Sequence, residues 1–311
     1  GNPSSPRIHL ISRYRTGTPP GPPHAGRAQL AEGGRIVAVG LVGQRDRVAD
    51  ALAAAAEAPD RVFVVRVDET VAALGRVAAA WISILVPRTL AVTGSVGKTT
   101  TKDLLAAGLG VRYVTLATRG NLNNLLGLPL TVLSLVPSHE AVVLEMGMNA
   151  PGEIEALCRI APPDIGLVTA VAPVHLEGLG SLEAVARAKS ELVIALPPEG
   201  IAVLNADDPR VLAMRRVARG RVLTFGQAAE ADVRIVSVQV DSLGHLAVEL
   251  MAGGQSVRVT PRLVGAHQAI NVAAALAGAM AADVPLREAA EAMAEVAPGR
   301  HRMEVVQAGA V

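Results

Sequence analysis

Apolar segments alternate with helical segments over the stretch from residue 89 to residue 218. Each apolar segment is a short run typical of a strand buried on both faces, and each intervening segment spaces its apolar residues as an amphipathic helix does. This alternation predicts an α/β fold in which a mostly parallel sheet is flanked by helices on both faces. The expected strands are 89–93, 111–116, 140–145, 164–170 and 200–204, and the expected helices are 98–109, 122–135, 152–160, 181–196 and 208–218.

The segments on either side of this stretch have other patterns. Residues 221–262 contain short β-type runs, which predict antiparallel strands at an edge of the sheet, and two helical segments follow them. Residues 1–88 predict a smaller α/β domain after a loop rich in proline and glycine, with strands 35–42 and 61–67 and helices 47–58 and 68–85. We therefore expect an N-terminal domain at 1–88, a central domain at 89–303 and a linker stub at 304–311.

Composition and charge disfavour several classes of partner. The 311 residues carry 29 basic and 28 acidic side chains, which leaves a net charge of +1, and only 2% of the residues are aromatic. Nucleic-acid binding is not expected, because it needs a basic surface and often aromatic stacking platforms. No apolar stretch reaches the ~20 residues of a membrane span and no leader pattern is present, so we expect no membrane insertion and a cytoplasmic location. A monomer is the expected state.

The stretch "AVTGSVGKTTTKDLL", residues 91–105, joins the first central strand to the first central helix. It has the ending of a phosphate-binding loop, although Val92 occupies the position of the first glycine in the common pattern. In such a loop, backbone N–H groups at a helix N-terminus bind phosphate oxygens, the lysine reaches the β and γ phosphates, and the next hydroxyl binds Mg²⁺. The pattern predicts a nucleotide site made of Gly94, Ser95, Val96, Gly97, Lys98, Thr99 and Thr100.

A carboxylate and a histidine follow two of the later strands. Glu145 is the last residue of the expected strand 140–145, and His175 follows the expected strand 164–170. Because ligands bind outside the carboxyl ends of the strands in open parallel sheets, both side chains are expected beside the phosphate loop. A carboxylate at that position is suited to holding Mg²⁺. We therefore predict that Glu145 is a metal ligand and that His175 is a second functional residue.

Lys189 lies on the apolar face of the expected helix 181–196. The residues at helical spacing from it, which form the same face, are apolar: Leu182, Val185, Val193 and Leu196. Lysine is almost never buried unless it is paired or chemically altered, so this position has two interpretations. In one, the side chain passes the apolar stripe and its ammonium group reaches solvent. In the other, Lys189 is modified to a carbamate, an anion able to bind a second Mg²⁺.

Together these residues resemble the Mur ligase family of ATP-dependent amide-forming enzymes. The family's shortened loop, T-G-x-x-G-K-[ST], matches Thr93 to Thr99 and accounts for Val92. The resemblance covers most of residues 60–305 and is greatest to the members that add D-alanyl-D-alanine to a UDP-N-acetylmuramoyl-tripeptide. The stretches that carry it are "TGSVGKTTTKDLL", "TRGNLNNLLGLPLTVL", "LEMGMNAPGEIEAL", "VHLEGLGSLEAVARAKSEL" and "GIAVLNADDP".

The resemblance implies a ligase reaction in the synthesis of peptidoglycan precursors. ATP would phosphorylate the terminal carboxylate of the UDP-N-acetylmuramoyl-tripeptide, and the amine of D-alanyl-D-alanine would then displace the phosphate. The resemblance also implies two Mg²⁺ ions, one held by Thr99 and Glu145 and the other by Glu145, His175 and carbamylated Lys189. Lys98, His175 and Lys189 would be the catalytic residues.

Three further residues receive roles from the resemblance. Asn121, in "GNLNN", would lie near the UDP substrate, whereas Asn271, in "GAHQAINVAAAL", and Arg302, in "GRHRMEV", would contact the nucleotide. The N-terminal domain resembles a degenerate form of the family's UDP-binding domain. The family's C-terminal domain is expected to be absent from this chain, which ends at Val311.

Two alternatives to a D-alanyl-D-alanine-adding ligase remain open. One keeps the ligase chemistry with another substrate, as in the folylpolyglutamate and cyanophycin synthetases, although the stretches "TRGNLNN" and "GEIEAL" disfavour it. The other is an ATP-binding module that does not ligate. The missing third domain favours this second alternative, whereas the presence of Lys98, Glu145, His175 and Lys189 disfavours it.

Overall fold

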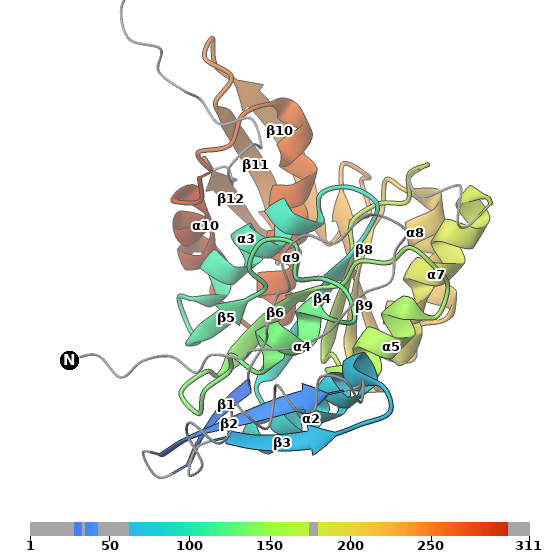
Figure 1. The fold of residues 1–311 in the computed structure, drawn as a ribbon. Coiled ribbons are helices and arrows are strands. Elements are labelled where there is room, and N and C mark those ends of the chain that lie inside the picture. Colours follow the sequence, from blue (N-terminus) through green and yellow to red (C-terminus); the bar gives the residue numbers. More distant parts are fainter. Residues whose placement is uncertain (1–27, 33–34, 43–61, 174–179, 298–311) are drawn as a thin grey trace, which may run out of the picture.

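A nine-stranded sheet forms the centre of the molecule, with the strand order β12-β11-β10-β9-β8-β7-β4-β6-β5 (Figure 1). The computed structural model of the chain describes residues 28–32, 35–42, 62–173 and 180–297. Strands β5, β6, β4, β7 and β8 run parallel to one another, as predicted, and β9 and the start of β10 continue the parallel pairing. Their bounds are β4 Arg88–Thr93, β5 Thr115–Ala117, β6 Ala141–Glu145, β7 Ile165–Val168, β8 Ile201–Asn205, β9 Arg221–Gly226, β10 Val233–Val240, β11 Leu246–Ala252 and β12 Gln255–Val259.

The edge of the sheet formed by β9 to β12 differs in part from the prediction. β9 pairs in parallel with β8, with Arg221 opposite Ile201, so the prediction of an antiparallel strand there is wrong. The chain between these strands contains α8 (Pro209–Ala213) and a 3₁₀ turn (Met214–Arg216), and such a crossover returns a strand in the parallel direction. The antiparallel prediction is confirmed for β10, β11 and β12.

Helices cover both faces of the sheet. Successive residues of a strand point to opposite faces, so strands such as β4 contribute side chains to two apolar clusters. In β4, Leu90 and Val92 pack in one apolar cluster with α3, α9 and α10, whereas Ala91 packs in a second cluster with α2, α4, α5 and α7. In the described part of the chain, no helix combines the length and the apolar character needed to cross a membrane. The helix bounds are α2 Thr70–Leu85, α3 Lys98–Leu109, α4 Gly127–Val132, α5 Glu153–Ile160, α7 Leu182–Ala195, α9 Ala269–Ala281 and α10 Leu286–Ala294.

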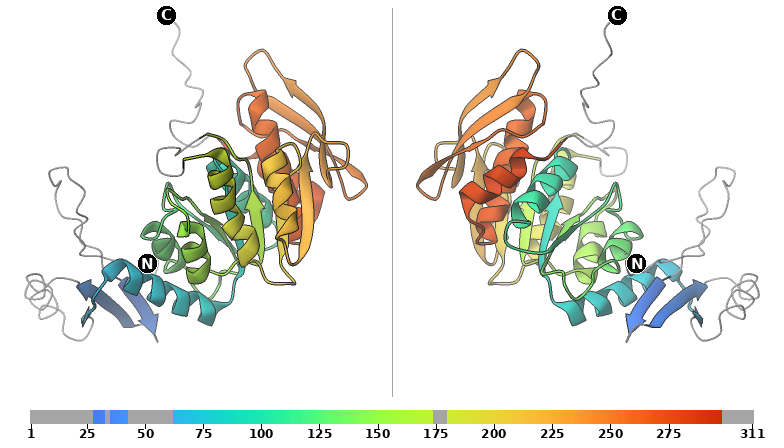
Figure 2. Two further views of the ribbon diagram at one scale, coloured as in Figure 1. Left: turned by 90° about the vertical axis from the view of Figure 1, so that its right-hand side faces the viewer. Right: turned by 90° about the vertical axis from the view of Figure 1, so that its left-hand side faces the viewer.

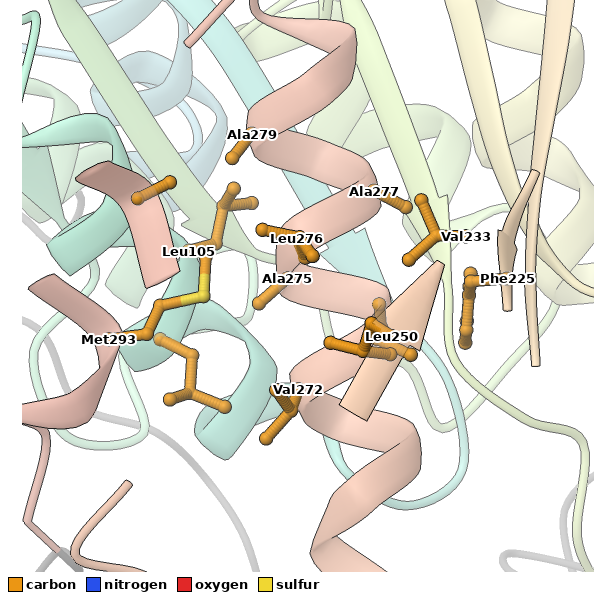
Figure 3. Packing of buried hydrophobic residues seen from close by; sticks show 14 of the residues in the cluster. Leu105, Phe225, Val233, Leu250, Val272, Ala275, Leu276, Ala277, Ala279 and Met293 are labelled. Atoms are coloured by element: carbon orange, nitrogen blue, oxygen red, sulfur yellow. The ribbon is translucent and has the colours of Figure 1, made fainter. Parts of the chain in front are cut away.

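The first cluster is centred on α9, whose surface consists mostly of small residues (Figure 3). Residues 273–277 of this helix are completely buried. A Cβ atom on Gly278 would lie 2.9 Å from Leu105 Cδ1 of α3, so the two helices approach closely. This packing fixes the position of α3 and therefore of the phosphate loop at its N-terminus. Figure 3 labels Val272, Ala275, Leu276, Ala277 and Ala279 of α9 and their neighbours Leu105, Met293, Phe225, Val233 and Leu250.

The N-terminal part contains a separate three-stranded sheet in the order β1-β2-β3. β1 (Ala28–Glu32) pairs antiparallel with β2 (Arg35–Val42), and β2 pairs in parallel with β3 (Val62–Arg66). Figure 2 shows α2 beside this sheet and beside the helices of the central unit, and α2 contacts β2 as well as α4 and α5. The buried hydrophobic side chains of α2, which are Ala73, Leu74, Ala78 and Ile82, belong to the second apolar cluster of the central unit. The predicted helix 47–58 and linker 304–311 lie outside the described residues, and the domain boundary near residue 88 stays a prediction.

The carboxyl ends of β4, β6 and β7 meet at one edge of the sheet, because these neighbouring strands are parallel. The phosphate loop follows β4, Glu145 ends β6, and Thr169 follows β7. Residues 118–126, which lead into α4, form a loop, so the predicted helix 122–135 is too long at both ends. This edge therefore gathers the polar residues that form the candidate site.

Candidate active site

The loop at residues 94–97 leaves β4 and leads directly into α3. Gly94 and Gly97 have φ angles of 148° and 82°, in the region that favours glycine. A Cβ atom on Gly94 would lie 1.8 Å from Thr169 Oγ1, and one on Gly97 would lie 2.2 Å from Asn271 Oδ1. Both positions require glycine, because side chains from the end of β7 and from α9 pack directly against the loop.

Hydrogen bonds from the segment after β7 hold this loop in place. Thr169 Oγ1 donates to the Val96 carbonyl at 2.5 Å, and the Ser95 N–H donates to the Ala170 carbonyl at 2.8 Å. The Ser95 hydroxyl donates to the Ala172 carbonyl at 3.2 Å. The sequence-based prediction missed Thr169, whose signal is its position directly after a buried strand of the parallel sheet.

Lys98 begins α3, and its side chain folds back over the loop. Its Nζ donates to the Gly94 carbonyl at 2.8 Å and to the Ser95 carbonyl at 3.4 Å. Gly97 occupies the N-cap position, and no described side chain caps this helix end. Backbone N–H groups at such a helix N-terminus can bind an anion, and the half-buried Thr99 and Thr100 belong to the same turn. The geometry is that of a phosphate-binding loop.

Glu145 is only 2% exposed, and its carboxylate is held from two sides. Thr99 Oγ1 donates to Oε2 at 2.8 Å, and Asn123 Nδ2 donates to Oε1 at 2.8 Å. The backbone N–H of Glu145 donates to Thr118 Oγ1 at 3.0 Å. The structure thus brings together Thr99 and Glu145, the two residues predicted to share a metal ion, and adds Asn123 and Thr118, which the sequence-based prediction missed.

The asparagine-rich loop at residues 118–126 presents a different asparagine from the predicted one. Asn121 is exposed, and its described contact is a backbone hydrogen bond from the Asn123 N–H to its carbonyl at 2.8 Å. Asn123 instead lies inward, where it contacts Glu145. It also packs against Gly147, because a Cβ atom added at Gly147 would lie 2.9 Å from Asn123 Oδ1. The sequence "GNLNN" indicates that an asparagine lies at this site, because it contains several of them, but it does not show which one faces the sheet.

Lys189 lies on α7 and is 3% exposed, so the interpretation in which its ammonium group reaches solvent finds no support. Ser181 caps this helix, with its hydroxyl accepting from the Ala184 N–H at 3.2 Å. Burial lowers the pKa of Lys189 from its ordinary value of 10.5 to about 7, and the positive charge of Lys98 contributes to the same shift. The charge of one predicted lysine therefore acts on the other, although they lie on separate helices.

Asn271 lies at the start of α9, against the phosphate loop. Its side chain is 7% exposed, its Oδ1 accepts a hydrogen bond from Thr101 Oγ1 at 3.3 Å, and its Nδ2 donates to Gln268 Oε1 at 2.7 Å. Asn271 thus braces the loop and α3 as well as lying near the predicted nucleotide site. Two other predicted residues, His175 and Arg302, lie outside the described residues.

The donor atoms at Thr99 and Glu145 suit a magnesium ion. Both residues offer oxygen, the ligand that Mg²⁺ prefers, and Mg²⁺ is commonly bound by one or two carboxylates together with substrate phosphates and water. Among the described residues, no group of three or more histidine, cysteine, aspartate or glutamate side chains forms a metal cluster. A site with one described carboxylate beside a phosphate loop fits a metal that arrives with the nucleotide.

A family model named "Mur ligase middle domain" matches residues 92–279, which include the loop, Glu145, Lys189 and Asn271. The chain belongs to the Mur ligase family. Among curated proteins, the UDP-N-acetylmuramoyl-tripeptide--D-alanyl-D-alanine ligase of Bacillus subtilis (strain 168) is 34% identical over 250 residues, which cover 80% of this chain and 53% of the relative. The corresponding ligase of Mycobacterium tuberculosis is 39% identical over 221 residues, which cover 71% of this chain and 43% of the relative.

Solved structures show the same likeness. A structure of MurF from Acinetobacter baumannii matches with a TM-score of 0.79 and 28% identity, over 87% of this chain and 62% of that one. The strand order and flanking helices of this Mur ligase chain thus correspond to those of a solved ligase. The chain spans about half the length of the curated relatives that it matches.

Proposed function

We propose that this Mur ligase chain belongs to an ATP-dependent ligase that adds D-alanyl-D-alanine to a UDP-N-acetylmuramoyl-tripeptide. The substrates are those named for the related ligases of Bacillus subtilis and Mycobacterium tuberculosis. The observation that carries the proposal is the contact between Thr99 Oγ1 and the Glu145 carboxylate at 2.8 Å, directly after a phosphate-binding loop. A strand-end carboxylate that contacts the loop hydroxyl is the arrangement expected for Mg²⁺ with a nucleoside triphosphate.

The phosphate loop is the proposed ATP site. The N–H groups of residues 94–100 and the Lys98 ammonium would hold the β and γ phosphates, and Asn271 and Arg302 would hold the rest of the nucleotide. A carboxylate is a poor acyl donor because its oxygen is a poor leaving group, so phosphorylation is needed before an amine can attack. Lys98 would stabilise the negative charge that develops during that transfer.

Thr99 and Glu145 would hold one Mg²⁺, and Glu145, His175 and carbamylated Lys189 a second. When bound, the metal neutralises phosphate charge during phosphoryl transfer. Lys189 suits carbamate formation because burial and Lys98 lower its pKa to about 7, which leaves a neutral amine able to add carbon dioxide near neutral pH. The resulting anion would replace an unfavourable buried cation beside Lys98.

The remaining assignments follow from the same proposal. Residues 89–303 would bind ATP, residues 1–88 would bind the UDP end of the peptide substrate, Asn121 would lie near that substrate, and residues 304–311 would lead to the family's third domain. The ligase would act in the cytoplasm, where its nucleotide-linked substrate is soluble. It would act as a monomer.

Two measurements test the proposal in order. Calorimetry should detect ATP binding that needs Mg²⁺ in the wild-type chain and is lost in Lys98→Ala. An assay for ADP should then show that its release requires the UDP-N-acetylmuramoyl-tripeptide. Provided that a complete enzyme is tested, Lys189→Ala should lose this turnover and regain part of it with short carboxylic acids, which replace the carbamate.

The outcomes separate the proposal from its alternatives. ATP binding that survives Lys98→Ala contradicts the nucleotide site. ATP binding with no ADP release on any carboxylate substrate favours a module that does not ligate. Release of ADP with a folate or another acid, but not with the muramoyl peptide, favours a related ligase with a different substrate.

A further inference from the structure

Lys102 is a second buried lysine at this end of the sheet, and neither the nucleotide site nor the carbamate uses it. It lies on α3 one helical turn after Lys98 and is 3% exposed. Its Nζ donates to the Thr118 carbonyl at 2.6 Å and pairs with Asp103 Oδ1 at 2.5 Å. Burying an ammonium group costs free energy unless polar partners satisfy it, so the contacts with Thr118 and Asp103 stabilise Lys102 at this position.

Thr118 connects this lysine to the proposed metal ligand. It follows β5, its N–H donates to the Val143 carbonyl at 3.0 Å, and its hydroxyl accepts from the Glu145 N–H at 3.0 Å. Thr118 is 1% exposed, which leaves little room for an alternative arrangement. The carbonyl of one buried residue therefore contacts Lys102, and its hydroxyl contacts the backbone of Glu145.

The segment that begins at Thr118 also carries Asn123, which donates to Glu145 Oε1 at 2.8 Å. The Asn123 carbonyl accepts from the Gly147 N–H at 2.8 Å, so the loop is bonded to the chain on both sides of the β6 terminus. Both the backbone and one carboxylate oxygen of Glu145 thus depend on the segment whose first residue Lys102 holds.

Two residues of α3 connect this helix to Glu145, one directly and one through Thr118. Thr99 and Lys102 are three residues apart on the helix and therefore lie on one face of it. Thr99 contacts the Glu145 carboxylate itself, and Lys102 contacts Thr118, whose hydroxyl accepts from the Glu145 N–H. The pair of contacts sets the distance and the orientation between the loop hydroxyl and the carboxylate, the two groups that would share a metal ion.

We propose that Lys102 is a positioning residue that, through Thr118, holds Glu145 in the orientation that binds Mg²⁺ at the nucleotide. This role rests on the proposed function, since it concerns the metal that accompanies ATP. Partners that orient a metal ligand from behind commonly change metal affinity about 10- to 100-fold when they are removed. Lys102 touches no reacting atom, so its effect is expected on metal affinity rather than on phosphate contacts.

The test measures ADP binding by calorimetry over a range of Mg²⁺ concentrations and also without Mg²⁺. Lys102→Met keeps the length of the side chain and removes the ammonium group. We expect it to raise the Mg²⁺ concentration needed for half of the metal-dependent gain in ADP affinity about tenfold, while metal-free ADP affinity changes less than about twofold. Thr118→Val should behave in the same way, because it removes the hydroxyl that holds the Glu145 N–H.

Two matched variants control for simple loss of packing or charge. Thr118→Ser keeps the hydroxyl and should retain the wild-type Mg²⁺ requirement. Asp103→Asn removes the charge of the more exposed partner of Lys102 but leaves the contact with Thr118, and it should also retain the wild-type requirement. Thermal unfolding of each variant verifies that the chain is folded, and the Thr118 pair decides the question if Lys102→Met does not fold.

Three results would overturn the positioning role. One is an equal loss of ADP affinity with and without Mg²⁺ in Lys102→Met, which is what a general distortion of α3 would produce. Another is an unchanged Mg²⁺ requirement in both Lys102→Met and Thr118→Val. The third is a wild-type chain that binds no ADP at any Mg²⁺ concentration, which overturns the proposed function as well, whereas the first two leave it standing.

Discussion

Polar residues are buried at one end of the central sheet and exposed to water at the other. At the carboxyl ends of the strands, Glu145, Lys189 and Thr169 are each less than 5% exposed. At the amino ends, a groove is lined by the first residues of β4, β7 and β8 together with several charged side chains. The ion pair between Arg88 and Asp283 in this groove spans 3.4 Å, with side chains that are 36% and 74% exposed. The same strands thus have polar groups in water at one end and polar groups out of water at the other.

This difference separates polar residues with a functional geometry from those that water solvates. Burying a polar or charged group costs free energy unless specific partners satisfy it, so the buried set at the carboxyl ends is tied to defined positions. An exposed ion pair contributes little, because water and salt screen it. Substitutions at the carboxyl ends are therefore expected to have large and specific effects, and those at the amino ends small ones.

The largest effect is expected from Gly94→Ala. The new Cβ atom would lie 1.8 Å from Thr169 Oγ1, and the φ angle of 148° is itself unfavourable for alanine. We expect the free energy of unfolding to fall by about 3 kcal/mol or more and nucleotide binding to be lost. Chemical denaturation and calorimetry measure the two effects.

Gly120 is the matched control for this glycine. It has a φ angle of 57° but no atom within 4 Å of an added Cβ atom, so Gly120→Ala carries the backbone strain without the collision. We expect a loss of about 1 kcal/mol for Gly120→Ala. Similar losses for the two alanine variants would show that the loop is not packed as tightly as the structure indicates.

Lys189→Met should stabilise the chain in a manner that depends on pH. Because the pKa of Lys189 is about 7 in the folded chain and 10.5 ordinarily, the unfolded chain binds more protons between these values. Wild-type stability therefore rises with pH across this window, and the deficit relative to Lys189→Met is complete below pH 7 and disappears toward pH 10.5. We expect a maximum difference of a few kcal/mol, since each pKa unit corresponds to about 1.4 kcal/mol.

Denaturation in buffers free of carbon dioxide, which keep the lysine unmodified, measures this difference from pH 6 upward. Adding bicarbonate should reduce the deficit of the wild type and leave Lys189→Met unchanged. A difference that is constant over the whole pH range would contradict the burial of an ionisable amine at this position.

Glu145→Gln should separate metal binding from folding. The amide can still accept from Asn123 with its oxygen and donate to Thr99, whose hydroxyl can rotate, so the free energy of unfolding should change by less than about 1 kcal/mol. The loss of the carboxylate charge should weaken the Mg²⁺-dependent part of nucleotide binding at least about tenfold. Calorimetry at two Mg²⁺ concentrations tests this, and an unchanged metal dependence would remove Glu145 from the proposed metal site.

The smallest effect is expected at the amino ends, from Asp283→Asn. Asparagine tolerates the φ angle of 59° found at this residue, so the substitution removes only the charge that faces Arg88. We expect a change in unfolding free energy within about 0.5 kcal/mol, with nucleotide binding unaffected. A loss comparable to that of Gly94→Ala would erase the contrast between the two ends of the sheet.

The sequence predicted the parts of this site that depend on local pattern. The phosphate loop follows from a strand, a glycine-rich turn and a helix in immediate succession, and the burial of Lys189 follows from its place on an apolar helix face. Thr118, Asn123 and Thr169 could not be assigned in this way, because their partners lie 22 to 73 residues away in the chain. The prediction for β9 was wrong because side chains alternate between the two faces in parallel and antiparallel strands alike. The local pattern therefore does not show the direction of the neighbouring strand.

The sequence by itself determined the α/β class, the position of the loop at the end of a central strand and the carboxylate that ends β6. Each of these depends on periodicity or on neighbouring residues, which the order of amino acids states directly. The tertiary structure alone decided that Asn123 rather than Asn121 faces Glu145 and that Lys102 reaches Thr118. Such contacts arise where separate strands and helices pack together, and their free energy depends on distances that no local pattern records.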